Sequence, residues 1–286
     1  MKQHYTVTEE DGVVRVDKFL AQMYPEYSRA AIAKLFTLNL IKLRGEPIQP
    51  GHKIRPGTSF EYDLGPLQAV PDVIPLPVIY EDANVIVVDK PTGIISHARG
   101  KFWQEASVAS FIRDRISGFE GERGGIVHRL DRATSGVMIC ARNEATLKSL
   151  QKQFSDRKVQ KTYYAVVAGK PMLEHAVIDA PIGRDMKTPQ KFLVTKEGKS
   201  AQTEYQVLAQ NEKYTLLKLQ PRTGRTHQLR VHLQYLGLPI VGDTLYEGEK
   251  AERLLLHARA LEISIPEKGM TTFEAPLPAI FSEYVQ

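Results

Sequence analysis

The sequence predicts an α+β fold: a large domain with a mixed, mainly antiparallel sheet, preceded by a small α+β module. Three observations support this prediction. Strand-like runs outnumber helical runs after residue 78. Two helical segments precede short strands before residue 65. Between the two regions lie Pro66, Pro71, Pro75 and Pro77, a proline density that argues against helix and favours an extended linker. We therefore expect a module at 1–65, a linker at 66–77 and a large domain at 78–286.

The elements of the N-terminal module follow from spacing and capping. Residues 16–24 carry apolar side chains at helical intervals. Ser28 is a suitable N-cap for a second helix over 29–38. Strands are expected at 40–43 and 59–62, with Gly45 and Pro47 marking a turn after the first.

The large domain alternates strands with a few helices. An apolar run predicts a buried strand at 84–89, and residues 137–141 predict another that contains the lone cysteine, Cys140. Helices are expected at 108–116, at 143–156 with Asn143 as the N-cap, and at 226–235. Further strands are expected at 161–168, 201–208, 214–220 and 254–265. Together these elements predict an α+β domain with several antiparallel pairs.

The composition bounds the class of protein. The chain has 286 residues, 42% hydrophobic content and a formal net charge of +5, which is a weak indication of a nucleic-acid partner. One cysteine allows no internal disulfide, and the histidines show no metal-site spacing, so we expect no metal site. The apolar runs are too short to span a bilayer, and the N-terminus lacks a signal sequence. We expect a cytoplasmic monomer.

The segment Gly125–Val137 contains the most informative residues of the chain. Asp131 lies between Arg129 and Arg132, after a Gly-Gly turn. Nearby guanidinium groups favour an ionised carboxylate, which can act as a nucleophile or as an electrostatic stabiliser. From residue types alone, a solvated surface ion pair would explain the same pattern.

The complete string from His128 to Gly136 changes this balance. His-Arg-Leu-Asp-x-x-Thr-Ser-Gly resembles the signature of the RluA-type pseudouridine synthases, which isomerise uridine in RNA. Segments 80–93, 161–169, 223–232 and 236–243, followed by Tyr246, resemble the family's other segments in the same order. The resemblance implies the pseudouridine synthase fold for the large domain and an isomerisation that needs no cofactor.

The resemblance also implies roles for individual residues. Asp131 would be the essential carboxylate, attacking the base or acting on the sugar. Tyr163 would stack on a flipped uracil or assist proton transfer at C5, whereas Tyr164 would point to the opposite face of its strand. Arg230 would hold Asp131, because a guanidinium can bind a carboxylate in a bidentate fork. A phosphate-contacting surface arginine is the alternative for Arg230.

The remaining expected substrate contacts lie in the same segments. Arg129 would fill the space left by the flipped base or hold its phosphate, and Leu229 would form an apolar wall. His128 could simply brace the loop, and Thr134 would fix it through hydrogen bonds. The full set of expected substrate-binding residues is His128, Arg129, Leu130, Thr134, Arg225, His227 and Leu229.

The N-terminal module resembles the alpha-L RNA-binding module. This resemblance implies a basic face that contacts RNA phosphates, formed by Arg29, Lys34, Lys42 and Arg44. A small cap packed on the large domain is the alternative.

The sequence leaves the substrate open. Members of the family that carry the alpha-L module often modify large-subunit ribosomal RNA, so ribosomal RNA is the expected partner and transfer RNA is the alternative. Two other classes remain in competition: a non-catalytic RNA-binding or ribosome-assembly factor, and a base-removing glycosylase. The presence of Asp131, Tyr163 and Arg230 together favours the synthase.

Overall fold

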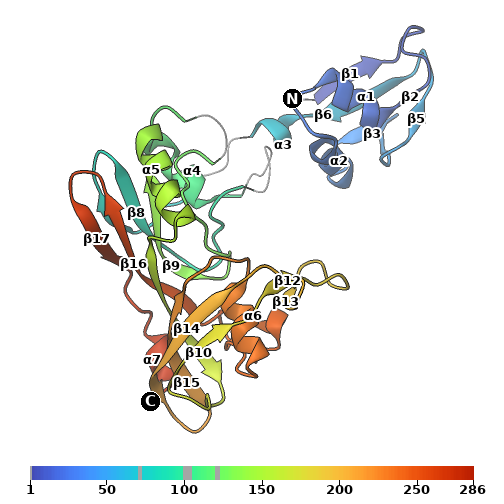
Figure 1. Cartoon of the computed structure of the whole chain (residues 1–286). Helices are drawn as coiled ribbons and strands as arrows, with labels where there is room; N and C mark the ends of the chain where they lie inside the picture. The colour runs from blue at the N-terminus through green and yellow to red at the C-terminus, as the bar shows by residue number, and fades with distance from the viewer. Residues whose placement is uncertain (1, 70–72, 99–104, 120–122) are drawn as a thin grey trace. The chain divides into compact units, whose positions relative to one another are not determined.

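The computed structural model describes residues 2–69, 73–98, 105–119 and 123–286 (Figure 1). The chain forms two compact units. One comprises Met1–Asp72 with Ala98–Ala106, and the other comprises Val73–His97 with Ser107–Gln286. Each unit has its own hydrophobic core. Among the described residues, no helix is long and apolar enough to cross a membrane.

The first unit packs two helices against short strands. Strands β1 (Lys2–Thr6), β6 (Ser59–Asp63), β3 (Ile41–Leu43) and β4 (Glu46–Pro47) form an antiparallel sheet in that order, and β2 (Val14–Arg15) pairs with β5 (Lys53–Ile54). Helices α1 (Val16–Met23) and α2 (Arg29–Thr37) bury Leu20, Ile32 and Leu35 in the core. The Ser28 hydroxyl accepts a hydrogen bond from the Ala31 amide, which confirms the predicted cap.

The prediction that the proline-rich segment contains no helix is wrong at its start. A short helix, α3, spans Gly65–Gln68. Pro66 occupies its first turn, where a missing amide proton costs nothing and the fixed φ suits a helix. Residues 73–77 form neither helix nor strand, and residues 70–72 of the expected linker lie outside the described part of the chain.

The second unit is built on a large mixed sheet. Its strands follow the order β11-β14-β15-β10-β16-β9-β8-β7, and β17 also pairs with β16. Only β9 and β16 run parallel among the described pairs, so the predicted α+β class with a mainly antiparallel sheet is confirmed. The strands are β7 (Val78–Glu81), β8 (Val85–Lys90), β9 (Ser135–Ala141), β10 (Gln160–Ala168), β11 (His175–Asp179), β14 (Gln202–Gln210), β15 (Tyr214–Pro221), β16 (Leu256–Ile265) and β17 (Gly269–Glu274).

Helices cover this sheet in two places. Helix α5 (Glu144–Ser155) packs against β9 and β16, and the Asn143 side chain caps it by accepting from the Thr146 amide. Helix α6 (Gln228–Tyr235) packs against β14 and β15 (Figure 1). The helix predicted over 108–116 is shorter, because α4 (Val108–Ile112) gives way to a 3₁₀ turn at Arg113–Arg115. A last short helix, α7, spans Ile280–Glu283.

The parallel pairing of β9 with β16 depends on one glycine. Gly136 has a φ of +114°, and a Cβ atom there would overlap the carbonyl of Ala258. This close approach follows directly after the Asp131 segment, so it fixes where that segment enters the sheet. Cys140, farther along β9, is fully buried as expected for a core residue.

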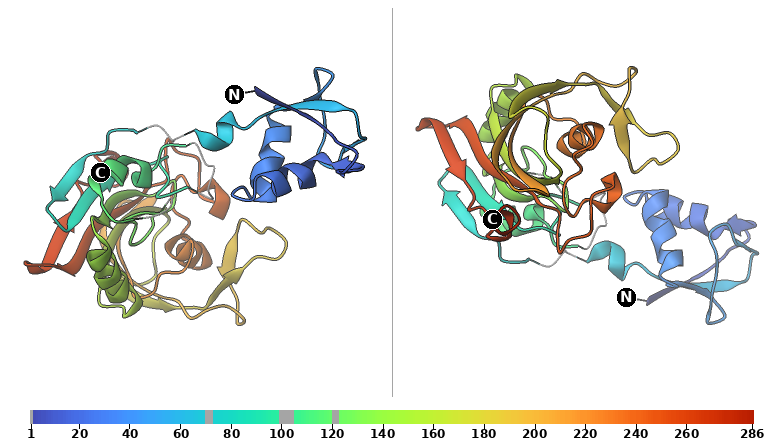
Figure 2. Two further views of the ribbon diagram at one scale, coloured as in Figure 1. Left: turned by 90° about the horizontal axis from the view of Figure 1, so that it is seen from above. Right: turned by 90° about the horizontal axis from the view of Figure 1, so that it is seen from below.

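A small hairpin stands apart from the main sheet. Strands β12 (Ile182–Arg184) and β13 (Phe192–Val194) pair with each other, and β13 contacts α6 (Figure 2). The sequence did not predict these two short strands. Phe192 of this hairpin contacts His227 with its ring and Tyr246 with its backbone amide.

Candidate active site

A cavity of about 510 Å³ opens beside the Asp131 segment. Its walls come from the loop before β9, the end of α5, the start of β10, and the loop from β15 into α6. All ten residues expected to act in catalysis or substrate binding in the large domain line it: His128, Arg129, Leu130, Asp131, Thr134, Tyr163, Arg225, His227, Leu229 and Arg230. The structure therefore brings together residues that are up to 102 positions apart in the chain.

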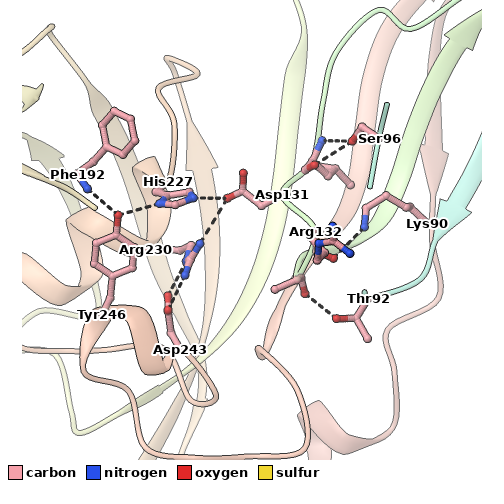
Figure 3. Close-up of polar contacts among 12 residues, drawn as sticks. Lys90, Thr92, Ser96, Asp131, Arg132, Phe192, His227, Arg230, Asp243 and Tyr246 are labelled. Carbon is pink, nitrogen blue, oxygen red and sulfur yellow. Dashed lines mark hydrogen bonds and ion pairs between the residues drawn. The ribbon is translucent and has the colours of Figure 1, made fainter. Parts of the chain in front are cut away.

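Asp131 faces two cationic or ionisable side chains of the α6 segment (Figure 3). One of its carboxylate oxygens lies 3.7 Å from Nε2 of His227 and 3.8 Å from a terminal guanidinium nitrogen of Arg230. The side chain of Asp131 keeps 24% of its exposure, so an incoming nucleotide can reach it. At 3.7–3.8 Å both contacts are longer than direct hydrogen bonds, and the contact with His227 is an ion pair only when the imidazole is protonated.

The bidentate fork expected between Arg230 and Asp131 is instead formed with Asp243. Two nitrogens of Arg230 each donate to a carboxylate oxygen of Asp243 at 2.6 Å. Burial would lower the pKa of Arg230, but Asp243 and then Asp131 raise it, so the guanidinium stays charged. Asp243 holds Arg230 in place, and Arg230 turns its remaining nitrogen toward Asp131.

His227 is held by a second set of contacts. Its φ of +56° places it in the left-handed region, immediately before α6. Its Nδ1 lies 2.8 Å from the Tyr246 hydroxyl, which accepts a hydrogen bond from the Phe192 amide. If Tyr246 donates to Nδ1, the proton of a neutral imidazole sits on Nε2 and faces Asp131. Burial lowers the pKa of His227, whereas the charge of Asp131 opposes that shift.

The last residue of β8 and the segment after it hold the Asp131 loop on the side away from Arg230 (Figure 3). The Ser96 hydroxyl donates to the Leu130 carbonyl and accepts from the Leu130 amide. The fully buried ammonium group of Lys90 donates to three carbonyls, those of Pro91, Ile94 and Arg132. Burial lowers the pKa of Lys90 to about 7, and Asp131 opposes that shift. Lys90 and Ser96 were not among the predicted site residues.

Tyr163 enters the cavity at an irregularity in β10. The register between β10 and β16 shifts between Thr162 and Tyr163, and such a bulge re-aims the side chain that follows it. Tyr163 lines the cavity, whereas Tyr164 is half-buried and does not line it. Burial, and then the charge of Asp131, raises the pKa of Tyr163, so its hydroxyl keeps its proton at neutral pH.

His128 braces the loop, as one of its two expected roles required. Its Nε2 accepts a hydrogen bond from the Ile139 amide of β9, and its ring stacks on Phe154 of α5 at 4.7 Å. Burial, and to a smaller extent Lys161, lowers the pKa of His128 to about 3. The imidazole is therefore neutral at pH 7, with its own proton on Nδ1.

This half-buried, neutral histidine predicts a pH dependence of stability. Between about pH 6.5 and pH 3 the unfolded chain binds a proton at His128 that the folded chain does not. The contribution of His128 is therefore complete above pH 6.5 and is lost as the pH falls. For His128→Gln, which keeps an acceptor for Ile139, we expect the free energy of unfolding to depend less on pH. The slope should be smaller by up to about 1.4 kcal/mol per pH unit.

Urea unfolding of both proteins at several pH values between 4.5 and 7 measures this slope. Identical slopes in the two proteins would show that His128 takes up its proton in the folded state as readily as in the unfolded state.

The loop between β15 and α6 is ordered by Gln228. Its side-chain oxygen accepts from the Thr223 hydroxyl and from the Arg225 amide. Its side-chain nitrogen donates to Thr203 and to the Gln202 carbonyl. Arg225 donates to the Ser200 carbonyl, and Leu229 is 7% exposed at the cavity wall. Thr134 is buried, and its amide donates to the Asp131 carbonyl.

The four basic residues expected to contact phosphates in the N-terminal module differ in their surroundings. Arg29 donates to the buried carboxylate of Asp17 at 2.8 Å, and Arg15 does so at 3.0 Å. Burial alone would raise the pKa of Asp17, but these two arginines lower it to about 2. Arg29 therefore has a structural role. Lys34 and Arg44 are exposed, and Lys42 is half-buried.

Comparisons with known proteins identify the family of this chain. Residues 84–235 match the family described as RNA pseudouridylate synthase. An uncharacterized RNA pseudouridine synthase of Aquifex aeolicus is 42% identical, over 81% of this chain and 76% of its own length. The ribosomal large subunit pseudouridine synthase D of Borreliella burgdorferi is 37% identical, over 98% and 91%.

A solved structure, that of human RNA pseudouridylate synthase domain containing 1, is similar with a TM-score of 0.60. It is 29% identical, over 73% of this chain and 86% of its own. Its fold is the one that the described residues of the larger unit adopt. This chain belongs to the RNA pseudouridine synthases, isomerases that act on RNA.

Proposed function

We propose that this enzyme converts specific uridines of large-subunit ribosomal RNA to pseudouridine, with Asp131 as its catalytic carboxylate. The observation that carries the proposal is the position of Asp131, partly exposed in the cavity wall and facing Arg230 and His227. The choice of ribosomal RNA is supported by the name of the Borreliella relative, which is similar along nearly the whole chain.

The reaction conserves every atom of the uridine. The bond between N1 and C1′ breaks, the uracil turns, and C5 bonds to C1′, while C5 loses a proton and N1 gains one. A uridine that is stacked in folded RNA must first unstack from its neighbours, at a cost of a few kcal/mol. In this proposal Arg129 fills the vacated space, and the base enters the cavity against Tyr163 and Leu229.

Each neighbour of Asp131 then has a defined task. Arg230 keeps positive charge beside the carboxylate without being able to lose its proton. Tyr163 lines the cavity with its hydroxyl protonated, and in this proposal its ring stacks on the uracil. The N-terminal module would add affinity through phosphate contacts of Lys34, Lys42 and Arg44. We propose a monomer that works in the cytoplasm.

The choice of RNA is tested with RNA from cells that lack the gene, labelled with tritium at C5 of uridine. Tritium leaves C5 only when that carbon is rejoined to the ribose. We expect purified enzyme to release tritium from ribosomal RNA and not from transfer RNA. Release from transfer RNA alone would replace the proposed substrate with the alternative class.

A further inference from the structure

A second cavity, of about 530 Å³, adjoins the active-site cavity. The two share the wall residues Arg157, Val159, Lys161, Pro221, Arg222 and Thr223, so they are direct neighbours. The second cavity extends away from Asp131 along the ends of β10, β14 and β15. Ser200, Gln202 and Gln220 give it hydroxyl and amide groups. None of the residues that line the second cavity was given a role in the reaction above.

The shared wall carries three basic side chains whose charges are compensated differently. Arg222 forms an ion pair with Glu204 at 3.0 Å. Lys161 is half-buried and donates at 3.4 Å to the Thr223 carbonyl, a neutral group. Burial lowers the pKa of Lys161, which means that its charge is poorly solvated where it lies. Arg157 is exposed at the same wall, just after the end of α5.

A phosphate is the anion that this position suits. Burying an ammonium group is unfavourable unless an anion or several acceptors stabilise it. Adjacent nucleotides of an RNA strand are joined by a single phosphate, so a uridine inside the first cavity brings a phosphate to one of its edges. Lys161 and Arg157 both belong to the wall that the two cavities share.

We propose that the second cavity binds the nucleotide next to the target uridine, and that the connecting phosphate lies on Lys161 and Arg157. This inference rests on the proposed function, because it assumes that the uridine occupies the first cavity. It assigns a recognition site for a neighbouring nucleotide to residues outside the reacting centre. The enzyme would then bind at least two consecutive nucleotides away from the RNA stack.

The test measures binding without turnover. In an Asp131→Asn background, the Kd for large-subunit ribosomal RNA from cells lacking the gene is measured by filter binding at 50 to 200 mM salt. We expect Lys161→Met with Arg157→Ala to weaken binding roughly tenfold or more. The slope of log Kd against log salt should fall by about 0.7 to 0.9, the value for one lost phosphate contact. Lys161→Arg, with Arg157 intact, keeps the positive charge, so it should leave both the affinity and the salt slope near their wild-type values.

Lys158→Ala is the matched control, because Lys158 is exposed one residue after Arg157 and lines neither cavity. An unchanged affinity and slope in the double variant would overturn the inference, and so would an equal loss in Lys158→Ala. If Lys161→Met unfolds, the single variants are compared instead. Arg157→Ala should weaken binding and Lys161→Arg should not, and an unchanged affinity in Arg157→Ala would overturn the inference. Failure of the proposed function would appear separately, as no tritium release by the wild type from ribosomal RNA.

Discussion

Asp131→Asn is expected to lower the rate of pseudouridine formation by about 10⁴-fold or more while leaving the fold intact. Loss of an essential nucleophile or of a charge that stabilises the transition state has effects of this size. The fold should tolerate the change, because the carboxylate contacts its neighbours only at 3.7 and 3.8 Å. The amide has nearly the same shape but carries no charge.

Single-turnover tritium release from ribosomal RNA measures this rate, and thermal unfolding checks the fold. Asp156→Asn is a suitable control, because Asp156 ends α5 at the surface and does not line the cavity. If Asp131→Asn kept more than about a tenth of the wild-type rate, another group would have to perform the chemistry.

Asp243→Ala is expected to cause a large loss of stability, larger than that of any other substitution proposed here. The side chains of Arg230 and Asp243 are 9% and 1% exposed, and Arg230 donates two hydrogen bonds of 2.6 Å to Asp243. Removing one partner of such a buried pair leaves an uncompensated charge and typically costs about 3–5 kcal/mol. In a unit of this size, the midpoint of thermal unfolding should fall by roughly 10 °C.

The same substitution should also impair catalysis, because Arg230 would lose the carboxylate that orients it beside Asp131. The double variant Asp243→Ala with Arg230→Met separates the two effects. It removes both charges, so it should recover part of the stability lost in the single variant but none of the activity. If the double variant lost as much stability as Asp243→Ala and Arg230→Met together, the two side chains would not form a direct buried pair.

Local signals predicted much of the architecture. The buried strands β8 and β9 follow from continuous apolar runs, and α2 and α5 begin at the caps expected from Ser28 and Asn143. The strands that were not predicted are short or polar: β1, β2, β4, β5, β7, β11, β12 and β13 have two to five residues each, and β17 buries only Phe273. Helix α3 was missed because Pro66 was treated as a helix breaker although it lies in a first turn.

The site was predicted from motif resemblance, and its geometry could not be. The segments around Asp131, Tyr163 and Arg230 were all recognisable in the sequence, but a motif does not say which carboxylate an arginine will bind. Asp243 lies 13 residues after Arg230 and reaches it only because the chain turns back after α6. The ammonium group of Lys90 likewise meets the carbonyl of Arg132, 42 residues later, only in the folded sheet.

Nucleoside analysis of the RNA product tests the central claim most directly. Ribosomal RNA from cells lacking the gene would be incubated with the wild type or with Asp131→Asn, digested to nucleosides and separated by chromatography. We expect the wild type to form pseudouridine in the same molar amount as the tritium released, and Asp131→Asn to form none. Free uracil with no pseudouridine would identify a glycosylase, and equal pseudouridine from both proteins would remove Asp131 from the reaction.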